Sequence, residues 1–183
     1  MANTVTFKPK QVTKRMLSHL PDRAYEVITN RFGITDDAQR KTLEAIGQKY
    51  GITRERVRQI ENAALGLIRK SQAFKDEKAV FDELKKLIHT LGAIVSEQDL
   101  LGHLSKDKLT QNHIHLYLTL GDEFTKHKED DHFKTRWSVD DDVSSEVHKS
   151  LKNLFENLTD DELVPESELV SRFLDEVKGL AEQ

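Results

Sequence analysis

The chain contains no cysteine, and only 3 prolines and 8 glycines among its 183 residues. Without cysteine it can form no disulfide, thiolate metal site or cysteine nucleophile. No stretch approaches the roughly 18 apolar residues of a membrane-spanning helix, and residues 1–10 contain no apolar signal core. These absences predict a soluble, cytoplasmic protein. Its length is sufficient for one compact domain or for two to three small ones.

Positive and negative charges are distributed unevenly along the chain. Residues 1–75 contain 15 Lys and Arg against 7 Asp and Glu, a net charge of +8, whereas residues 76–183 contain 13 against 25, a net charge of −12. A basic end attracts polyanions, and an acidic end repels them or binds a basic protein. The alternative is an accident of surface charge, so the decision depends on the motifs.

Apolar residues at helical spacing predict four helices in the basic part. Pro21 ends the first helix, and Gly33 stands where the residue after a helix C-terminus belongs. The third helix runs from about residue 42 to 50. Thr53 is a good N-cap for the fourth helix, which begins at Arg54.

The third and fourth helices have the spacing of a helix-turn-helix. Gly51 can take the positive φ of a tight turn, and Gly47 lies on the side where a partner helix must come close. Val57 and Ile60 supply the apolar face of the fourth helix. These residues serve packing, so they predict the fold and only suggest its use.

The outward face of the fourth helix carries groups that can contact DNA bases. Opposite the apolar face, or exposed in the first turn, lie Arg54, Glu55, Arg58 and Gln59. Arg can donate two bonds to guanine, Gln can pair with adenine, and Glu can accept from cytosine. Arg56 and Lys49 flank the turn and suit phosphates. A charged face usually means a solvated helix with intrahelical pairs, but this one lies in the segment with a net charge of +8, which favours DNA.

Several stretches of this part are specific when taken together. They are Leu-Pro-Asp-Arg at 20–23, Arg-Phe-Gly-Ile at 31–34, Thr-Leu-Glu-Ala-Ile-Gly at 42–47 and Gly-Ile-Thr-Arg-Glu-Arg-Val-Arg-Gln-Ile-Glu at 51–61. Together they resemble region four, the C-terminal promoter-recognition domain of bacterial RNA polymerase sigma factors. The resemblance covers roughly residues 11–70, about a third of the chain.

The resemblance implies partners and roles. The outward-face residues would read the upstream, minus-thirty-five type promoter element, and Arg23, Arg31 and Arg56 would hold phosphates or lie near them. In the family, this domain also grips the flap of the polymerase β subunit through its earlier helices. The implied partners are double-stranded promoter DNA and bacterial RNA polymerase, and the implied location is the nucleoid. Nothing before Gln11 could be the core-clamping sigma domain, so we expect the chain not to open a promoter unaided.

Residues 76–139 have the element order of a winged helix. Three helices are predicted at about 80–92, 96–104 and 110–121, followed by alternating apolar and polar residues over 123–139 around a polar turn at 129–132. The order is similar to the winged-helix domain of the delta subunit of some bacterial RNA polymerases, without a diagnostic motif. Possible DNA contacts on the wing are Lys126, Lys128, Lys134 and Arg136. Because residues 76–138 have a net charge of −3, contact with a partner protein is favoured.

Residues 140–183 are predicted to form an acidic helical tail. The pattern over 147–158 and 163–170 parallels that over 81–91 and 94–101, so the tail is either a degenerate half-repeat or two ordinary amphipathic helices. Residues 139–183 have a net charge of −9. Such a tail could cover the basic face of the first domain or dock on a basic polymerase surface.

No catalytic or metal-binding pattern is apparent. His113 and His115 lie on different sides of a predicted helix, and His127 and His132 lack a third ligand. We expect no metal, cofactor, enzymatic activity or small-molecule substrate, and no membrane association. The sequence predicts a mainly α protein with a helix-turn-helix domain at 1–75, a winged-helix module at 76–139 and an acidic helical tail at 140–183. Its predicted function is a sequence-specific, DNA-binding transcription initiation factor or regulator; the alternative is a polymerase accessory subunit or antagonist that acts by protein contact.

Overall fold

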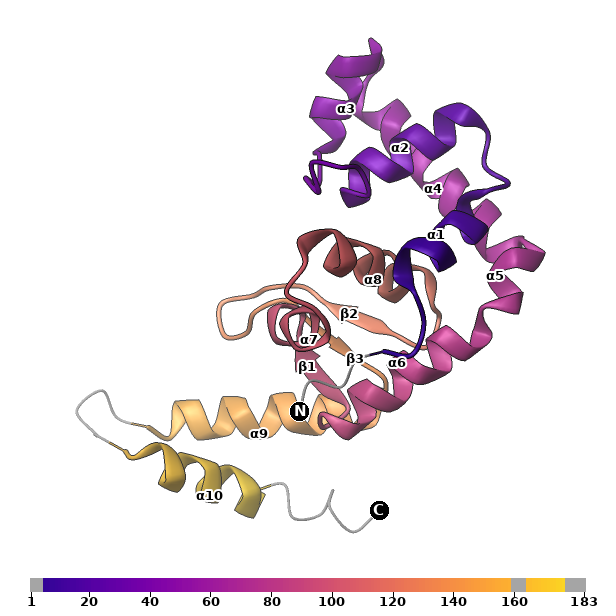
Figure 1. The fold of residues 1–183 in the computed structure, drawn as a ribbon. Coiled ribbons are helices and arrows are strands. Elements are labelled where there is room, and N and C mark those ends of the chain that lie inside the picture. Colours follow the sequence, from indigo (N-terminus) through magenta and orange to yellow (C-terminus); the bar gives the residue numbers. More distant parts are fainter. Residues whose placement is uncertain (1–4, 159–163, 177–183) are drawn as a thin grey trace.

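The computed structural model describes residues 5–158 and 164–176, and these residues are mainly helical (Figure 1). The basic part contains α1 (Pro9–Leu17), α2 (Asp22–Phe32), α3 (Leu43–Tyr50), α4 (Arg54–Lys70) and α5 (Gln72–Asp76). The rest contains α6 (Lys78–Thr90), β1 (Ile94–Ser96), α7 (Glu97–Leu104), α8 (Lys108–Leu120), β2 (Thr125–His127), β3 (Arg136–Ser138), α9 (Asp141–Glu156) and α10 (Glu166–Glu176). This confirms the predicted mainly α class. None of the described helices combines the length and apolar character needed to cross a membrane.

The capping groups confirm the predicted ends of α2 and α3 and the predicted start of α4. The first helix ends earlier than the predicted Pro21, at Leu17, where the Ser18 hydroxyl donates to the carbonyl oxygen of Arg15, and α5 was not predicted. Gly33 and Gly51 follow α2 and α3 with φ of 64° at both positions, which is the left-handed conformation that glycine adopts without strain. The side chain of Thr42 accepts a hydrogen bond from the backbone N–H of Ala45 and so caps α3. Thr53 caps α4 in the same way.

The second module has the topology of a winged helix. Its strands form an antiparallel sheet in the order β1-β3-β2, in which Ile94 and Thr125 both pair with Ser138. The sequence predicted only one hairpin with long strands, and this expectation was wrong in two respects. It missed β1, because three residues are too few to show a period of two, and it extended the strands beyond the three residues that pair.

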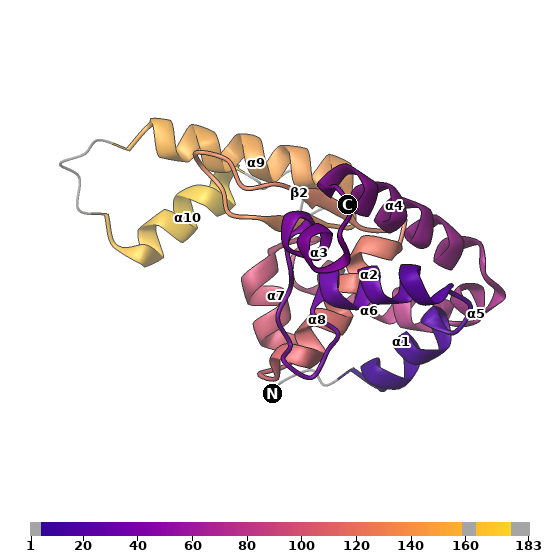
Figure 2. The same ribbon diagram turned by 90° about the horizontal axis from the view of Figure 1, so that it is seen from above.

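One large hydrophobic core spans the first two modules. It includes buried residues from α1, α2 and α4 together with residues from α6, α7, α8 and β3. The central element is α8, which packs against α1, α2 and α4 on one side and against α7 on another (Figures 1 and 2). A smaller cluster of Val27, Ile46 and Val57 holds α3 against α2 and α4. The predicted division at residues 75 and 76 therefore does not coincide with a gap in the core.

Polar side chains on α8 complete the contact between the two modules. Asn112 donates to the carbonyl oxygens of Gly33 at 2.9 Å and Ala38 at 2.8 Å. The hydroxyl of Thr13 lies 2.8 Å from Nδ1 of His113 and 2.7 Å from the hydroxyl of Tyr117. Because these buried groups are paired, their burial carries no large desolvation penalty.

The tail packs against the wing. Helix α9 begins at Asp141, near the start of the predicted helical tail, because the Asp140 side chain accepts from the backbone N–H of Val143. Arg136 of β3 donates a hydrogen bond to Nε2 of His148 on α9, and α10 packs on α9. Figure 1 shows both tail helices at the end of the molecule opposite α3. Residues 159–163, part of the proposed half-repeat, lie outside the described residues.

Candidate nucleic-acid interface

The turn between α3 and α4 is fixed by close backbone packing. A Cβ atom built on Gly47 would lie 2.6 Å from the carbonyl oxygen of Ile52, so only glycine fits there without a shift. On the other side of the turn, Val57 is fully buried against Ile46 and Val27. These contacts set the orientation of α4 relative to α3, as the spacing of Gly47, Gly51, Val57 and Ile60 predicted.

The structure brings the predicted base-reading residues together on one exposed stretch of α4. The exposed residues are Arg54, Glu55, Arg58 and Gln59. Val57, which precedes Arg58, is buried, and Ile60, which follows Gln59, is half-buried. Figure 1 places α3 and α4 in the part of the molecule away from the tail, so the described tail helices leave this stretch uncovered.

These side chains pair with one another along the helix. Arg58 donates to both carboxylate oxygens of Glu55, at 2.8 and 2.7 Å, and Arg56 donates to Oε1 of Gln59 at 3.1 Å. The hydrogen bond and charge of Arg58 lower the pKa of Glu55. Both partners of the Glu55–Arg58 pair are exposed, so solvent screens their attraction. The pairing is therefore too weak to prevent base contacts.

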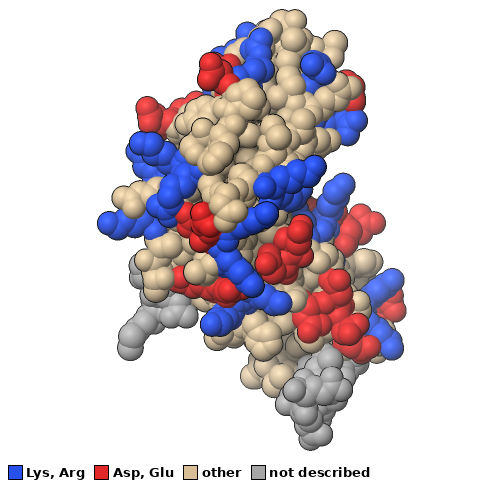
Figure 3. Space-filling model, turned by 90° about the vertical axis from the view of Figure 1, so that its right-hand side faces the viewer, with Lys and Arg blue, Asp and Glu red and all other residues tan. Residues whose placement is uncertain are grey.

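The predicted phosphate-binding residues lie in different environments. Lys49 and Arg23 are exposed and both approach the ring of Tyr50. Arg31 is less free, because it donates to Glu61 at 3.3 Å and to the carbonyl oxygen of Lys41 at 3.2 Å. Beside it, a hollow of about 400 Å³ is lined by Arg31, Thr42, Leu43, Glu44 and Arg54. Figure 3 views the molecule from the right-hand side of Figure 1 and shows a band of basic side chains with most of the acidic ones below it.

Two of the four predicted wing cations bind internal partners. Lys126 donates to Glu97 at 3.0 Å and lies 5.0 Å from the centre of the Trp137 ring. Arg136 has a side chain that is only 12% exposed, and it holds the wing together through Asp130, the carbonyl oxygens of residues 128 and 134, and His148. Lys128 and Lys134 are exposed. Of the predicted wing contacts, these two are therefore the better placed for a phosphate.

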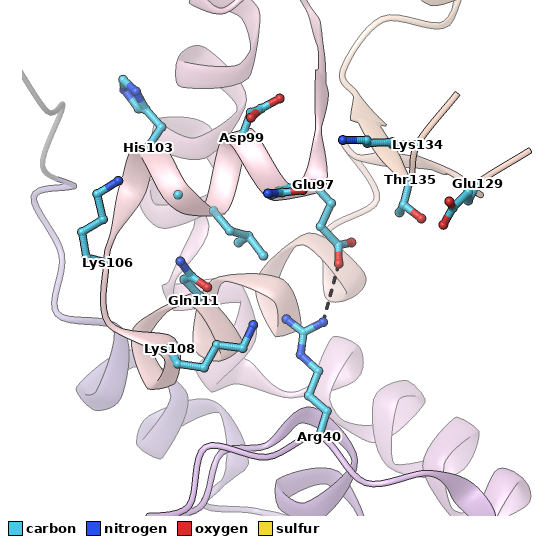
Figure 4. A pocket seen from close by; sticks show the side chains of 13 residues that line it. Arg40, Glu97, Asp99, His103, Lys106, Lys108, Gln111, Glu129, Lys134 and Thr135 are labelled. Atoms are coloured by element: carbon cyan, nitrogen blue, oxygen red, sulfur yellow. Dashed lines mark ion pairs between the residues drawn. The ribbon is translucent and has the colours of Figure 1, made fainter. Parts of the chain in front are cut away.

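A charged cluster around Glu97 was not predicted from the sequence. Its carboxylate accepts from Trp137 Nε1 at 2.9 Å and pairs with Arg40 at 3.6 Å, as well as with Lys126. Burial alone would raise the pKa of Glu97, but hydrogen bonds and charges from His115 and Lys126 outweigh it and hold the pKa well below its usual range. The cluster borders an open hollow of about 940 Å³, with Lys106 and Lys108 on one side and Lys134 on the other (Figure 4).

The described residues contain no group of three or more His, Asp or Glu side chains placed to hold a metal ion. What the geometry does define is a helix-turn-helix whose second helix presents an exposed, mixed polar face. This is the arrangement by which DNA-binding domains of this class enter a major groove.

Comparison with known proteins finds similarity over the helix-turn-helix domain. Residues 16–70 match the family model "Sigma-70, region 4". The RNA polymerase sigma factor RpoD of Helicobacter pylori strain 26695 is 44% identical over 63 residues, and RpoD of strain J99 is equally similar. The match covers 34% of this chain but only 9% of each sigma factor. The helix-turn-helix domain is thus similar to sigma-70 region 4, and the likeness to the sigma factors covers only this segment.

Proposed function

We propose that this protein is a transcription factor that binds double-stranded promoter DNA through α4 and contacts bacterial RNA polymerase. The observation that supports this most is the exposed face of Arg54, Glu55, Arg58 and Gln59 within a segment that matches sigma region 4. In this proposal α4 enters the major groove, and the arginines, the glutamate and the glutamine contact base edges. The flanking cations Arg23, Lys49 and Arg56, and more weakly Arg31, contact phosphates and set the register.

The packing of α8 limits which surface of this chain could contact polymerase. The family resemblance assigns the grip on the β flap to the earlier helices of the domain, and here α1 and α2 both pack against α8. A flap contact would therefore use the surface of α1 and α2 that α8 leaves exposed.

A second candidate function is an accessory subunit or antagonist of polymerase that acts by protein contact alone. The acidic tail favours this reading, because 13 acidic and 4 basic residues between 139 and 183 repel DNA and suit a basic protein surface. The internal partners of Lys126 and Arg136 also leave the wing fewer cations for a phosphate backbone.

A gel-shift experiment with duplexes carrying different upstream promoter elements separates the two. Under the first proposal, Gln59→Ala relaxes the preference at one base pair by about 1–3 kcal/mol. Lys49→Ala weakens binding to every duplex and lowers the slope of log K against log salt by about 0.9. Equal effects of both variants on all duplexes would contradict base reading. Polymerase that co-purifies with a chain unable to bind any duplex would support the second candidate.

A further inference from the structure

An aromatic side chain links two of the predicted phosphate-binding residues. The guanidinium carbon of Arg23, in the first turn of α2, lies 4.5 Å from the centre of the Tyr50 ring. The ammonium nitrogen of Lys49, at the end of α3, lies 5.0 Å from the same centre. Cations at such distances are attracted by the electron-rich face of the ring. Tyr50 thus brings together two cations from different helices beside the turn that leads into α4.

The ring itself is fixed by the small core under the turn. Tyr50 is half-buried and packs against the cluster of Val27, Ile46 and Val57. Its hydroxyl accepts a long hydrogen bond of 3.4 Å from Asn30. Because the ring is held by packing, it can hold flexible side chains in place and so lower the conformational entropy that they lose on binding.

The positive charge at this position is poorly balanced. Among the described residues, the one carboxylate paired with either cation is Glu26, whose Oε2 lies 3.9 Å from Arg23, and both side chains of that pair are about half exposed. Lys49 has no hydrogen bond or ion pair from its side chain within the described part of the chain. Two like charges drawn to one ring repel each other, and an anion placed between them would remove that cost.

The geometry points to Tyr50 as a positioning residue of a phosphate clamp, in which Arg23 and Lys49 bind one backbone phosphate of the duplex that α4 contacts. This inference rests on the proposed DNA binding and extends it, since it gives Tyr50 a role in that binding. The clamp fixes the position of the duplex relative to the turn and carries no base preference.

The test compares Tyr50→Leu, which removes the ring, with Tyr50→Phe, which keeps it and loses only the hydroxyl. Tyr25→Leu is the matched control, because Tyr25 is an exposed tyrosine of α2 that has no ring contact in the described residues. Fluorescence anisotropy with a short duplex at several salt concentrations gives Kd and the salt slope, and thermal unfolding sets a temperature at which all variants are folded.

We expect Tyr50→Leu to raise Kd about threefold to tenfold for every duplex and to lower the salt slope by up to about 0.9, since the cations lose their shared anchor. Tyr50→Phe and Tyr25→Leu should stay within about twofold of the wild type. In a chain that already carries Arg23→Ala and Lys49→Ala, Tyr50→Leu should have little further effect. An unchanged salt slope, or the same loss in that background, would show that the ring acts only through packing and would overturn the clamp.

A second measurement separates the clamp from the proposed function. Titration of the full chain with inorganic phosphate, followed by NMR, should shift the side-chain signals of Arg23 and Lys49 in the wild type and in Tyr50→Phe, but not in Tyr50→Leu. If the wild type binds no duplex at any salt concentration, the proposed function is wrong and this titration alone decides the clamp. The absence of any shift at these side chains would refute it.

Discussion

Asn112 of α8 accepts a hydrogen bond from Nε of Arg40 at 2.8 Å, and this bond joins the winged helix to the loop between α2 and α3. The same amide donates to the carbonyl oxygens of Gly33 and Ala38. One fully buried side chain therefore forms hydrogen bonds with three polar groups of the helix-turn-helix domain. The third helix of the winged helix is occupied by this contact, so α8 cannot enter a DNA groove while the two modules are packed together.

Replacement of Asn112 by leucine should destabilise the fold. The substitution keeps the volume but leaves two carbonyl oxygens without their donor and Nε of Arg40 without its acceptor, at a cost of about 2–4 kcal/mol in the free energy of unfolding. Urea denaturation measures it. Asn153→Leu, at an exposed position of α9, serves as the control and should change the free energy of unfolding by less than about 0.5 kcal/mol. Equal stabilities of the two variants would mean that the amide contributes nothing to the contact between modules.

Replacement by alanine should have opposite effects on the free energy of unfolding at two glycines of the helix-turn-helix. At Gly47 the added methyl meets the Ile52 carbonyl oxygen at 2.6 Å, so Gly47→Ala should lower the free energy of unfolding by about 1–3 kcal/mol and weaken duplex binding by displacing α4. At Gly66, inside α4, nothing lies within 4 Å, so Gly66→Ala should stabilise by up to about 1 kcal/mol. Thermal unfolding and anisotropy test both variants. A Gly47→Ala protein as stable as the wild type would show that the turn tolerates a wider separation between residue 47 and the Ile52 carbonyl oxygen.

The contact between the wing and α9 should weaken in acid. Burial, followed by the charge of Arg136, lowers the pKa of His148 below its ordinary value of 6.5, and the pKa of His127 is lowered for the same reasons. Nearby Asp130 and Asp141 oppose these shifts without reversing them. A depressed folded-state pKa means that the stabilisation is present above about pH 6.5 and is lost as the pH falls through the folded-state pKa.

His148→Gln tests this pH dependence, because glutamine can still accept from Arg136 but does not titrate. Between about pH 7.5 and about pH 5.5, the urea midpoint of the wild type should fall further than that of His148→Gln. His89→Gln, which changes an exposed histidine of α6, is the control and should follow the wild type. Identical pH profiles for all three proteins would exclude His148 as a source of acid sensitivity.

Local patterns predicted the elements of the basic part well. The positions of Gly33, Gly51, Thr42 and Thr53 determine where α2, α3 and α4 begin or end, and each effect acts within one helical turn. The outward face of α4 was predictable for the same reason, because the periodicity of buried residues determines which residues are exposed.

Contacts between distant segments were not predictable. Asn112, His113 and Glu97 are polar residues on amphipathic helices, and no sequence rule distinguishes a buried, paired side chain from a solvated one. The wing cations illustrate the same limit, since Lys126 and Arg136 differ from Lys128 and Lys134 only in the partners that tertiary packing supplies. Whether the described modules also fold separately depends on the contacts of α8, which the sequence did not reveal.

Removal of Glu55 should separate affinity from specificity. The carboxylate repels phosphates and pairs with Arg58 in the free protein, so Glu55→Ala should bind unrelated duplexes more tightly. It should also discriminate less against a changed base pair, by about 1–3 kcal/mol, because the acceptor for cytosine is lost. Competition anisotropy with cognate and scrambled duplexes measures both. Glu44→Ala on α3 is the charge-matched control, for which only the general affinity should rise.

The most direct test of base reading by α4 is selection from a library of random duplexes, performed in parallel with the wild-type chain and with Gln59→Ala. We expect the wild type to enrich one short motif and the variant to enrich the same motif with a single position relaxed. Enrichment of no motif by the wild type, or of an unchanged motif by the variant, would contradict base reading by α4.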